Sequence, residues 1–147
     1  MMQEAMPEIL APVGAQAQLL AAVRCGADAV YLGTRGFNAR RNAENFDGEA
    51  LREAVAYCHA RGVAVHVTVN TLVLDGEMEE LERVADAVAQ SGADAVIIQD
   101  MAVLQLFLNR YPSIARHAST QTAVHNADGA KFLADAGFDR FVLAREL

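Results

Sequence analysis

Apolar residues gather in short, nearly continuous runs that are separated by longer amphipathic stretches. The runs at residues 9–11, 28–32, 63–69, 95–98 and 141–144 lack polar alternation, and a more polar segment at 116–119 completes the series. Such runs predict short strands that are covered on both faces, as in a parallel sheet. The stretches between them place apolar residues on one helical face, as with Leu19, Leu20 and Val23, and predict five helices.

A repeated phrase marks the beginning of several predicted strands. GADAV begins at Gly26 and again at Gly92, and a weaker copy, GFDRF, begins at Gly137. Glycine can adopt the left-handed conformation that ends a helix, and aspartate favours the turn that follows. Gly62 stands at the same place before residues 63–69. The repetition therefore predicts a series of joints from helix to strand in a β/α array.

Six strands and five helices fit either a doubly wound sheet or a β/α barrel. The doubly wound fold usually has a glycine-rich ligand turn after its first strand, and no G-x-G-x-x-G is present. We therefore predict an α/β fold that forms the first six parallel strands of a (β/α)8 TIM-type barrel, which takes about 250 residues when complete. Residues 1–147 are expected to be a truncated N-terminal segment, because the sequence stops just after a strand without its covering helix.

Composition indicates the setting of the protein more than its chemistry. Of the 147 residues, 53% are hydrophobic and 21% are charged, and no apolar run approaches the roughly 20 residues of a membrane helix. The N-terminus lacks the pattern of a signal peptide, which favours a cytoplasmic protein. Cys25 and Cys58 are interpreted as packing residues, since two cysteines make neither a disulfide framework nor a complete metal site.

The net charge of −7 argues against broad nucleic-acid binding by the whole segment, but it leaves room for a local basic patch. Arg35, Arg40 and Arg41 form such a patch in the polar loop of residues 33–46. Arginine side chains bind phosphate or carboxylate through paired donors, so Arg40 is a candidate for anion binding. The alternative is that these arginines only neutralise Glu44 and Asp47 on a solvated loop.

In a β/α array the ligand site lies at the carboxyl ends of the strands. No nucleophile–base pair stands out there, and the four histidines lack the spacing of a zinc site. His117, which lies close to a strand exit, and Asp100 are the candidates for catalysis. The polar residues at the other strand exits are candidates for substrate binding: Asn70, Gln99, Ser119, Gln121, Arg145 and Glu146.

Most of these candidates also have a structural interpretation. Asp100 is well placed as the N-cap of the helix that follows it, and we favour that role over acid–base catalysis. Asn70 and Gln121 suit amide recognition of a substrate edge, or they hold adjacent loops together. Arg145 and Glu146 either form an ion pair in the site or pair with each other at the end of the sequence.

Six motifs in a fixed order give the chain a family resemblance. They are GADAVYLG (26–33), FNAR (37–40), VTVNTL (67–72), QDM (99–101), HASTQ (117–121) and VLAREL (142–147). Together they closely resemble the N-terminal part of the collagenase-like peptidase family U32, and the resemblance covers nearly the whole chain. Val13 and Ala102 replace the usual alanine and glycine of the family, which are small changes.

The resemblance implies a barrel and two kinds of activity. The family was named for peptidase activity, although its catalytic residues were never settled, and relatives assist hydroxylation of RNA bases or of the ubiquinone ring. Such relatives carry an iron–sulfur cluster on four cysteines, and the RNA-directed ones use prephenate, a small carboxylate. Cys25 and Cys58 do not match the cluster cysteines, which are expected beyond Leu147. This chain alone is therefore expected to bind no cofactor.

Three functions remain open. The first is the N-terminal barrel segment of a protein that assists hydroxylation of an RNA pyrimidine base, with Arg40 on a phosphate or carboxylate co-substrate and Asn70, Gln99 and Gln121 on a base edge. The second is a peptidase that acts on collagen-like or other extended peptides. The third is a non-catalytic half-barrel completed by a partner chain, and the open barrel edge also allows self-association. No membrane partner is expected, and activity is expected of the full-length protein.

Overall fold

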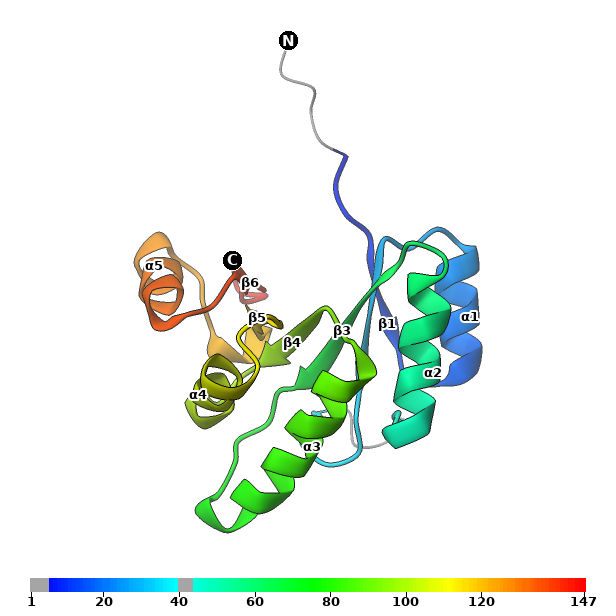
Figure 1. The fold of residues 1–147 in the computed structure, drawn as a ribbon. Coiled ribbons are helices and arrows are strands. Elements are labelled where there is room, and N and C mark those ends of the chain that lie inside the picture. The colour runs from blue at the N-terminus through cyan, green and yellow to red at the C-terminus, as the bar shows by residue number, and fades with distance from the viewer. Residues whose placement is uncertain (1–5, 40–43) are drawn as a thin grey trace.

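The computed structural model describes residues 6–39 and 44–147. Six strands alternate with five α-helices along the chain (Figure 1). The strands are β1 (Leu10–Val13), β2 (Ala29–Gly33), β3 (Ala64–Val69), β4 (Ala95–Ile98), β5 (Ala115–Ala118) and β6 (Arg140–Phe141). The helices are α1 (Gln16–Arg24), α2 (Gly48–His59), α3 (Met78–Ser91), α4 (Met101–Arg110) and α5 (Ala127–Ala136).

The strands form one parallel sheet in the order β1-β2-β3-β4-β5-β6, so every strand pairs with its neighbours in the sequence. The sheet curls into a half-barrel with the helices around its outside (Figure 1). All carboxyl ends therefore lie at one rim, because parallel strands run in one direction. The predicted α/β half-barrel of six parallel strands is confirmed.

The hydrophobic core lies between the outer face of the sheet and the helices. Val65, Val67 and Val69 alternate along β3, and all three are fully buried in this core. The helices contribute large side chains such as Leu51 and Phe107, which are also fully buried. Each such side chain contributes about 1.5–3 kcal/mol when it leaves water, so this layer holds the sheet in its curved form.

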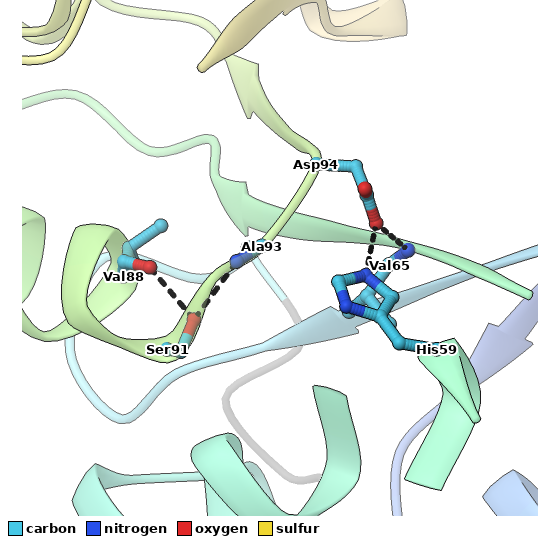
Figure 2. Close-up of polar contacts among 6 residues, drawn as sticks. All are labelled: His59, Val65, Val88, Ser91, Ala93 and Asp94. Atoms are coloured by element: carbon cyan, nitrogen blue, oxygen red, sulfur yellow. Dashed lines mark hydrogen bonds and ion pairs between the residues drawn. The ribbon is translucent and has the colours of Figure 1, made fainter. Parts of the chain in front are cut away.

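The aspartates of the repeated phrase join alternate pairs of strands at their amino ends. The Asp28 carboxylate accepts a hydrogen bond from the Ile9 amide at 2.8 Å, and Asp94 accepts one from Val65 at 2.7 Å (Figure 2). Asp139 does the same for the Arg116 amide at 2.8 Å. We call these three contacts between an aspartate side chain and a backbone amide the aspartate clasps. They join β1 to β2, β3 to β4 and β5 to β6. β3 and β5 have an alanine where β2, β4 and β6 have the aspartate. The pairs β2–β3 and β4–β5 are therefore held by backbone hydrogen bonds and side-chain packing.

The described parts of the loop, residues 33–39 and 44–46, are more buried than the polar loop that the sequence suggests. Phe37, Asn38 and Phe46 are all buried, and an isolated bridge joins Thr34 to Phe46. Two short 3-10 helices, Asp75–Glu77 and Thr120–Thr122, were also not predicted. No helix within the described residues is long and apolar enough to span a bilayer.

Candidate functional site

Two adjoining hollows open on the carboxyl rim of the half-barrel. Their volumes are about 190 and 220 Å³. Side chains from β2, β3 and the two segments that follow β5 and β6 line both, so the hollows form one continuous depression. The residues common to both are Tyr31, Thr68, Asn70, Thr120 and Arg145.

One wall of this rim depression depends on a glycine. A Cβ atom at Gly33 would lie 1.8 Å from Asn38 Nδ2, so only glycine leaves space for the Asn38 side chain. The buried Asn38 amide accepts a hydrogen bond from the Thr68 hydroxyl at 3.0 Å and donates one to Asn45 Oδ1 at 2.7 Å. This network fixes the loop after β2 against the end of β3.

Asn70 supports the same wall. Its side-chain oxygen accepts a hydrogen bond from the Ala39 amide at 3.1 Å, and its backbone amide donates to the Phe37 carbonyl at 2.9 Å. The side-chain oxygen of Asn70 therefore holds adjacent loops together, as one of the two interpretations of this residue predicted. Its Nδ2 group has no partner among the described residues, and Asn70 lines both hollows, so it can still donate to a ligand.

Four of the residues predicted at strand exits come together in the rim depression. Asn70 and Arg145 line both hollows, Gln121 lines the first and Ser119 lines the second. The Ser119 hydroxyl accepts a hydrogen bond from the Gln121 amide at 3.2 Å, which caps the 3-10 helix after β5. Among the residues that the structure describes, Arg145 is the only charged side chain that lines these hollows, so their described lining is polar with one positive group. Whether these residues bind a ligand stays a prediction.

The other predicted site residues lie differently. Gln99 and Glu146 are not among the residues that line the two hollows, and no ion pair joins Glu146 to Arg145. Arg40 lies outside the described residues. Asp100 is the N-cap of α4: Oδ1 accepts from the Ala102 amide at 2.8 Å and Oδ2 from the Val73 amide at 3.0 Å. Both Asp100 oxygens thus have backbone partners, and its catalytic role stays a prediction.

His117 lies below the rim depression rather than in it. It is buried on the inner face of β5, and its ring lies 4.7 Å from that of His66 on β3, edge to face. Burial lowers the pKa of His117 to about 4, with the nearby His66 and Arg140 adding to the effect. His117 is therefore an uncharged imidazole at neutral pH, and it is not among the residues that line the two hollows.

Three of the five residues that line both hollows were not among the predicted site residues. Tyr31 lies two positions before the end of β2, Thr68 lies one position before the end of β3, and Thr120 follows Ser119. The alternation of side chains along a strand could have identified Tyr31 and Thr68, since residues two apart lie on the same face of a strand. Thr68 shares a face with Asn70, and Tyr31 shares one with Gly33.

The donors in this chain do not fit an iron–sulfur cluster. Cys58 is buried on α2, where desolvation raises the pKa of its thiol, and Cys25 is exposed after α1. Among the described residues no three His, Cys, Asp or Glu side chains gather as a metal site would require. Whether residues outside this chain hold a cluster is a separate expectation.

The fold and the rim define the class of protein: a parallel β/α half-barrel with a polar depression at its carboxyl ends. The family model described as Peptidase family U32 matches residues 14–147. The chain belongs to this family, as the six motifs indicated.

Several characterised relatives are similar over almost all of the chain. It is 44% identical to the 23S rRNA 5-hydroxycytidine C2501 synthase of Escherichia coli, over 95% of this chain and 21% of that protein. It is 38% identical to a collagenase of Porphyromonas gingivalis and 34% identical to tRNA hydroxylation protein P1 of Bacillus subtilis, in each case over 95% of this chain and 33% of the relative. The chain therefore spans a fifth to a third of the length of these relatives.

The fold itself has a solved counterpart. The structure of the U32 peptidase Mk0906 matches 97% of this chain and 60% of its own length, with a TM-score of 0.75 and 15% identity. At that identity the match concerns the fold alone.

Proposed function

We propose that this chain is the N-terminal half-barrel of a protein that assists hydroxylation of a pyrimidine base in RNA. The main support is the rim depression, whose described residues include amides, hydroxyls, the aromatic ring of Tyr31 and the guanidinium of Arg145. A pyrimidine presents carbonyl oxygens, ring nitrogens and a flat face, which such side chains bind by hydrogen bonds and stacking. The 44% identity to an rRNA hydroxycytidine synthase agrees with this substrate class.

The roles follow from the chemistry of each lining side chain. Asn70 Nδ2 and the Gln121 amide would contact the base edge, and Tyr31 offers an aromatic ring against which a base can stack. Arg145 would bind a base carbonyl or the carboxylate of a small co-substrate, since its guanidinium carries paired donors. Arg40, which is not among the described residues, and Gln99, which does not line the two hollows, remain candidates for phosphate, carboxylate or base contacts.

RNA mass spectrometry tests the proposal. A strain that lacks the gene should lose a hydroxylated pyrimidine from its tRNA or rRNA, and the wild-type gene should restore it. Arg145→Gln should restore little of the modification, whereas Arg61→Gln should restore it fully. Arg61 is a suitable control because it donates to the Tyr57 carbonyl and stacks on the Tyr57 ring, just before the amino end of β3. Unchanged hydroxylation in the deletion strain would overturn the proposal.

A peptidase that cleaves collagen-like peptides is the second candidate, because a P. gingivalis collagenase is 38% identical over 95% of this chain. His117 and Asp100 would then be the catalytic groups. The burial of His117 and the two backbone partners of Asp100 argue against this function. Purified full-length protein should cleave gelatin, and His117→Ala and Asp100→Asn should abolish cleavage, if the peptidase proposal is right.

A non-catalytic role, in which a partner chain or a second copy completes the half-barrel, is the third candidate. β1 and β6 are the ends of the sheet, and each has an edge that no other strand of the described chain pairs. An ion pair between Glu8 and Arg140, 3.3 Å apart, already links the two ends at the amino rim. Size-exclusion chromatography of the isolated chain should show a dimer or larger species if these edges associate, and a clean monomer would contradict this role.

A further inference from the structure

The polar side chains that line the rim depression differ in the hydrogen bonds that they can still form with a ligand. Asn70, Thr120 and Arg145 each line both hollows. The protein itself engages some of their donors and acceptors and leaves the others open. The open groups decide which edge of a base the depression can bind, because a donor on the protein requires an acceptor on the base.

Arg145 contributes donors alone. Its guanidinium carries its N–H groups in a rigid planar fork and has no acceptor. No hydrogen bond or ion pair with another described residue engages this side chain, which is exposed at the rim. Two neighbouring N–H groups can therefore bind two acceptors that lie side by side on a ligand.

Asn70 contributes one donor and Thr120 one acceptor. The Asn70 oxygen accepts from the Ala39 amide at 3.1 Å, whereas its Nδ2 group has no partner among the described residues. The Thr120 hydroxyl donates to the Leu143 carbonyl at 3.3 Å, so its hydrogen is engaged and its oxygen can accept from a ligand. The Gln121 amide, which lines the first hollow, can donate or accept and does not select between bases.

The two pyrimidines of RNA present different patterns on their Watson–Crick edges. Cytosine has two adjacent acceptors, O2 and N3, followed by the N4 amino donor, whereas uracil alternates an acceptor, a donor and an acceptor at O2, N3–H and O4. An arginine fork fits the two adjacent acceptors of cytosine, but it would meet the N3–H group of uracil with another N–H group. Binding at this edge leaves the C5–C6 edge of the ring open to hydroxylation.

We propose that Arg145 selects cytosine over uracil in the rim depression. Its guanidinium donates to O2 and N3 of the base, Asn70 Nδ2 is a second donor to O2, and the Thr120 oxygen accepts from the N4 amino group. The inference rests on the proposed function, which names a pyrimidine but not which one, and it assigns Arg145 to the base. A carboxylate also offers two adjacent acceptors, so a carboxylate co-substrate on Arg145 is the competing outcome.

Two single-stranded RNA oligonucleotides test the assignment with the full-length protein. Each has the same purine sequence around one pyrimidine, which is cytidine in one and uridine in the other. Fluorescence anisotropy should show about tenfold tighter binding of the cytidine oligonucleotide, as one bidentate base contact predicts. Arg145→Lys should lose most of this preference, because an ammonium keeps the charge without the fork. Arg145→Gln should favour uridine, because a primary amide offers an adjacent donor and acceptor to O4 and N3–H of uracil.

The control variant is Arg61→Gln, which should keep the cytidine preference because Arg61 lies away from the depression and contacts Tyr57. Equal affinity of the wild-type protein for the two oligonucleotides, or a cytidine preference that survives in Arg145→Lys and Arg145→Gln, would overturn the proposal. If Arg145→Gln abolishes hydroxylation in cells while the preference is unchanged, Arg145 binds a carboxylate co-substrate and its assignment to the base is wrong. Hydroxylation in the deletion strain is scored separately, so failure of the base selection and failure of the proposed function give different results.

Discussion

The rings of His66 and His117 lie edge to face on the inner surface of the half-barrel, with centroids 4.7 Å apart and planes at 88°. Both side chains are buried, and the Nδ1 atom of His66 has no partner among the described residues. Burial lowers the pKa of both imidazoles, and Arg140 adds to this effect in each case. The carboxylates of Glu8, Asp94 and Asp139 act in the opposite direction and are outweighed.

This pair predicts a loss of stability in mild acid. The unfolded chain takes up a proton on each histidine near its ordinary pKa of 6.5, whereas folded His117 does so only near 4. The stabilising contribution is therefore complete above pH 6.5 and is lost as the pH falls toward 4, by about 3 kcal/mol for His117. Urea unfolding of the protein at several pH values between 7 and 4 measures this.

His117→Phe supplies the comparison for the pH prediction, because a phenyl ring has a similar shape and does not titrate. This variant should lose less stability than the wild type between pH 6.5 and pH 4. His59→Phe is the control, since His59 is exposed and forms its contact with Asp94 at the amino rim. Identical pH dependence in wild type and His117→Phe would show that the buried pair is not the cause.

Gly33 sets the shape of the rim depression, which predicts a large difference between two glycine substitutions. Gly33→Ala would bring a Cβ within 1.8 Å of Asn38 Nδ2, so Asn38 must leave its place beside Thr68. Overpacking of this kind costs about 1–3 kcal/mol, and the displaced loop should also weaken ligand binding. Gly76→Ala is the control, because no atom lies within 4 Å of its Cβ position. Equal melting temperatures for the two variants would contradict this account.

The sequence identified most of the strand-exit residues that line the rim depression, but not the residues within the strands that line it too. Asn70, Ser119, Gln121 and Arg145 meet at the rim because parallel strands place all their carboxyl ends together. Gln99 does not join them, because β4 passes directly into α4 and Asp100 is needed as the cap of that helix. Propensity alone cannot decide between a cap and a catalytic carboxylate, since both require the same residue at the same turn.

Other features required contacts that no local pattern encodes. Asn38 is a polar residue in a polar loop, yet it is 3% exposed because the missing side chain of Gly33 leaves space for it. The partnership of His66 with His117 joins strands that are two apart in the sheet. The histidine contact depends on the curvature of the sheet, which brings residues from different strands together on the inner face.

The aspartate clasps predict that one carboxylate stabilises each alternate strand pair. Asp94→Ala would leave the amide of fully buried Val65 with one fewer acceptor and would also free His59. The expected loss is about 1–3 kcal/mol in the free energy of unfolding, measured by urea titration. Asp135→Ala should change stability by less than about 0.5 kcal/mol, since Asp135 is exposed on α5 and its side chain makes no hydrogen bond or ion pair with the other described residues. Similar losses in the two variants would mean that the clasp contributes nothing specific.

Substitution of Asp100 separates its structural role from a catalytic one. Asn is as good an N-cap as Asp, so Asp100→Asn should keep the contact to Ala102 through its single oxygen and lose the one to Val73, because its NH2 group cannot accept from an amide. Asp100→Ala should lose both contacts, with about 0.5–2 kcal/mol for the cap alone. If Asp100 acts only as a cap, Asp100→Asn restores pyrimidine hydroxylation in the deletion strain to the wild-type level. A well-folded Asp100→Asn protein that restores no hydroxylation, beside an Asp100→Ala protein that is equally inactive, would instead assign the carboxylate to the chemistry, because Asp100→Asn keeps the cap of α4. Circular dichroism at the growth temperature verifies that both variants remain folded when the RNA is analysed.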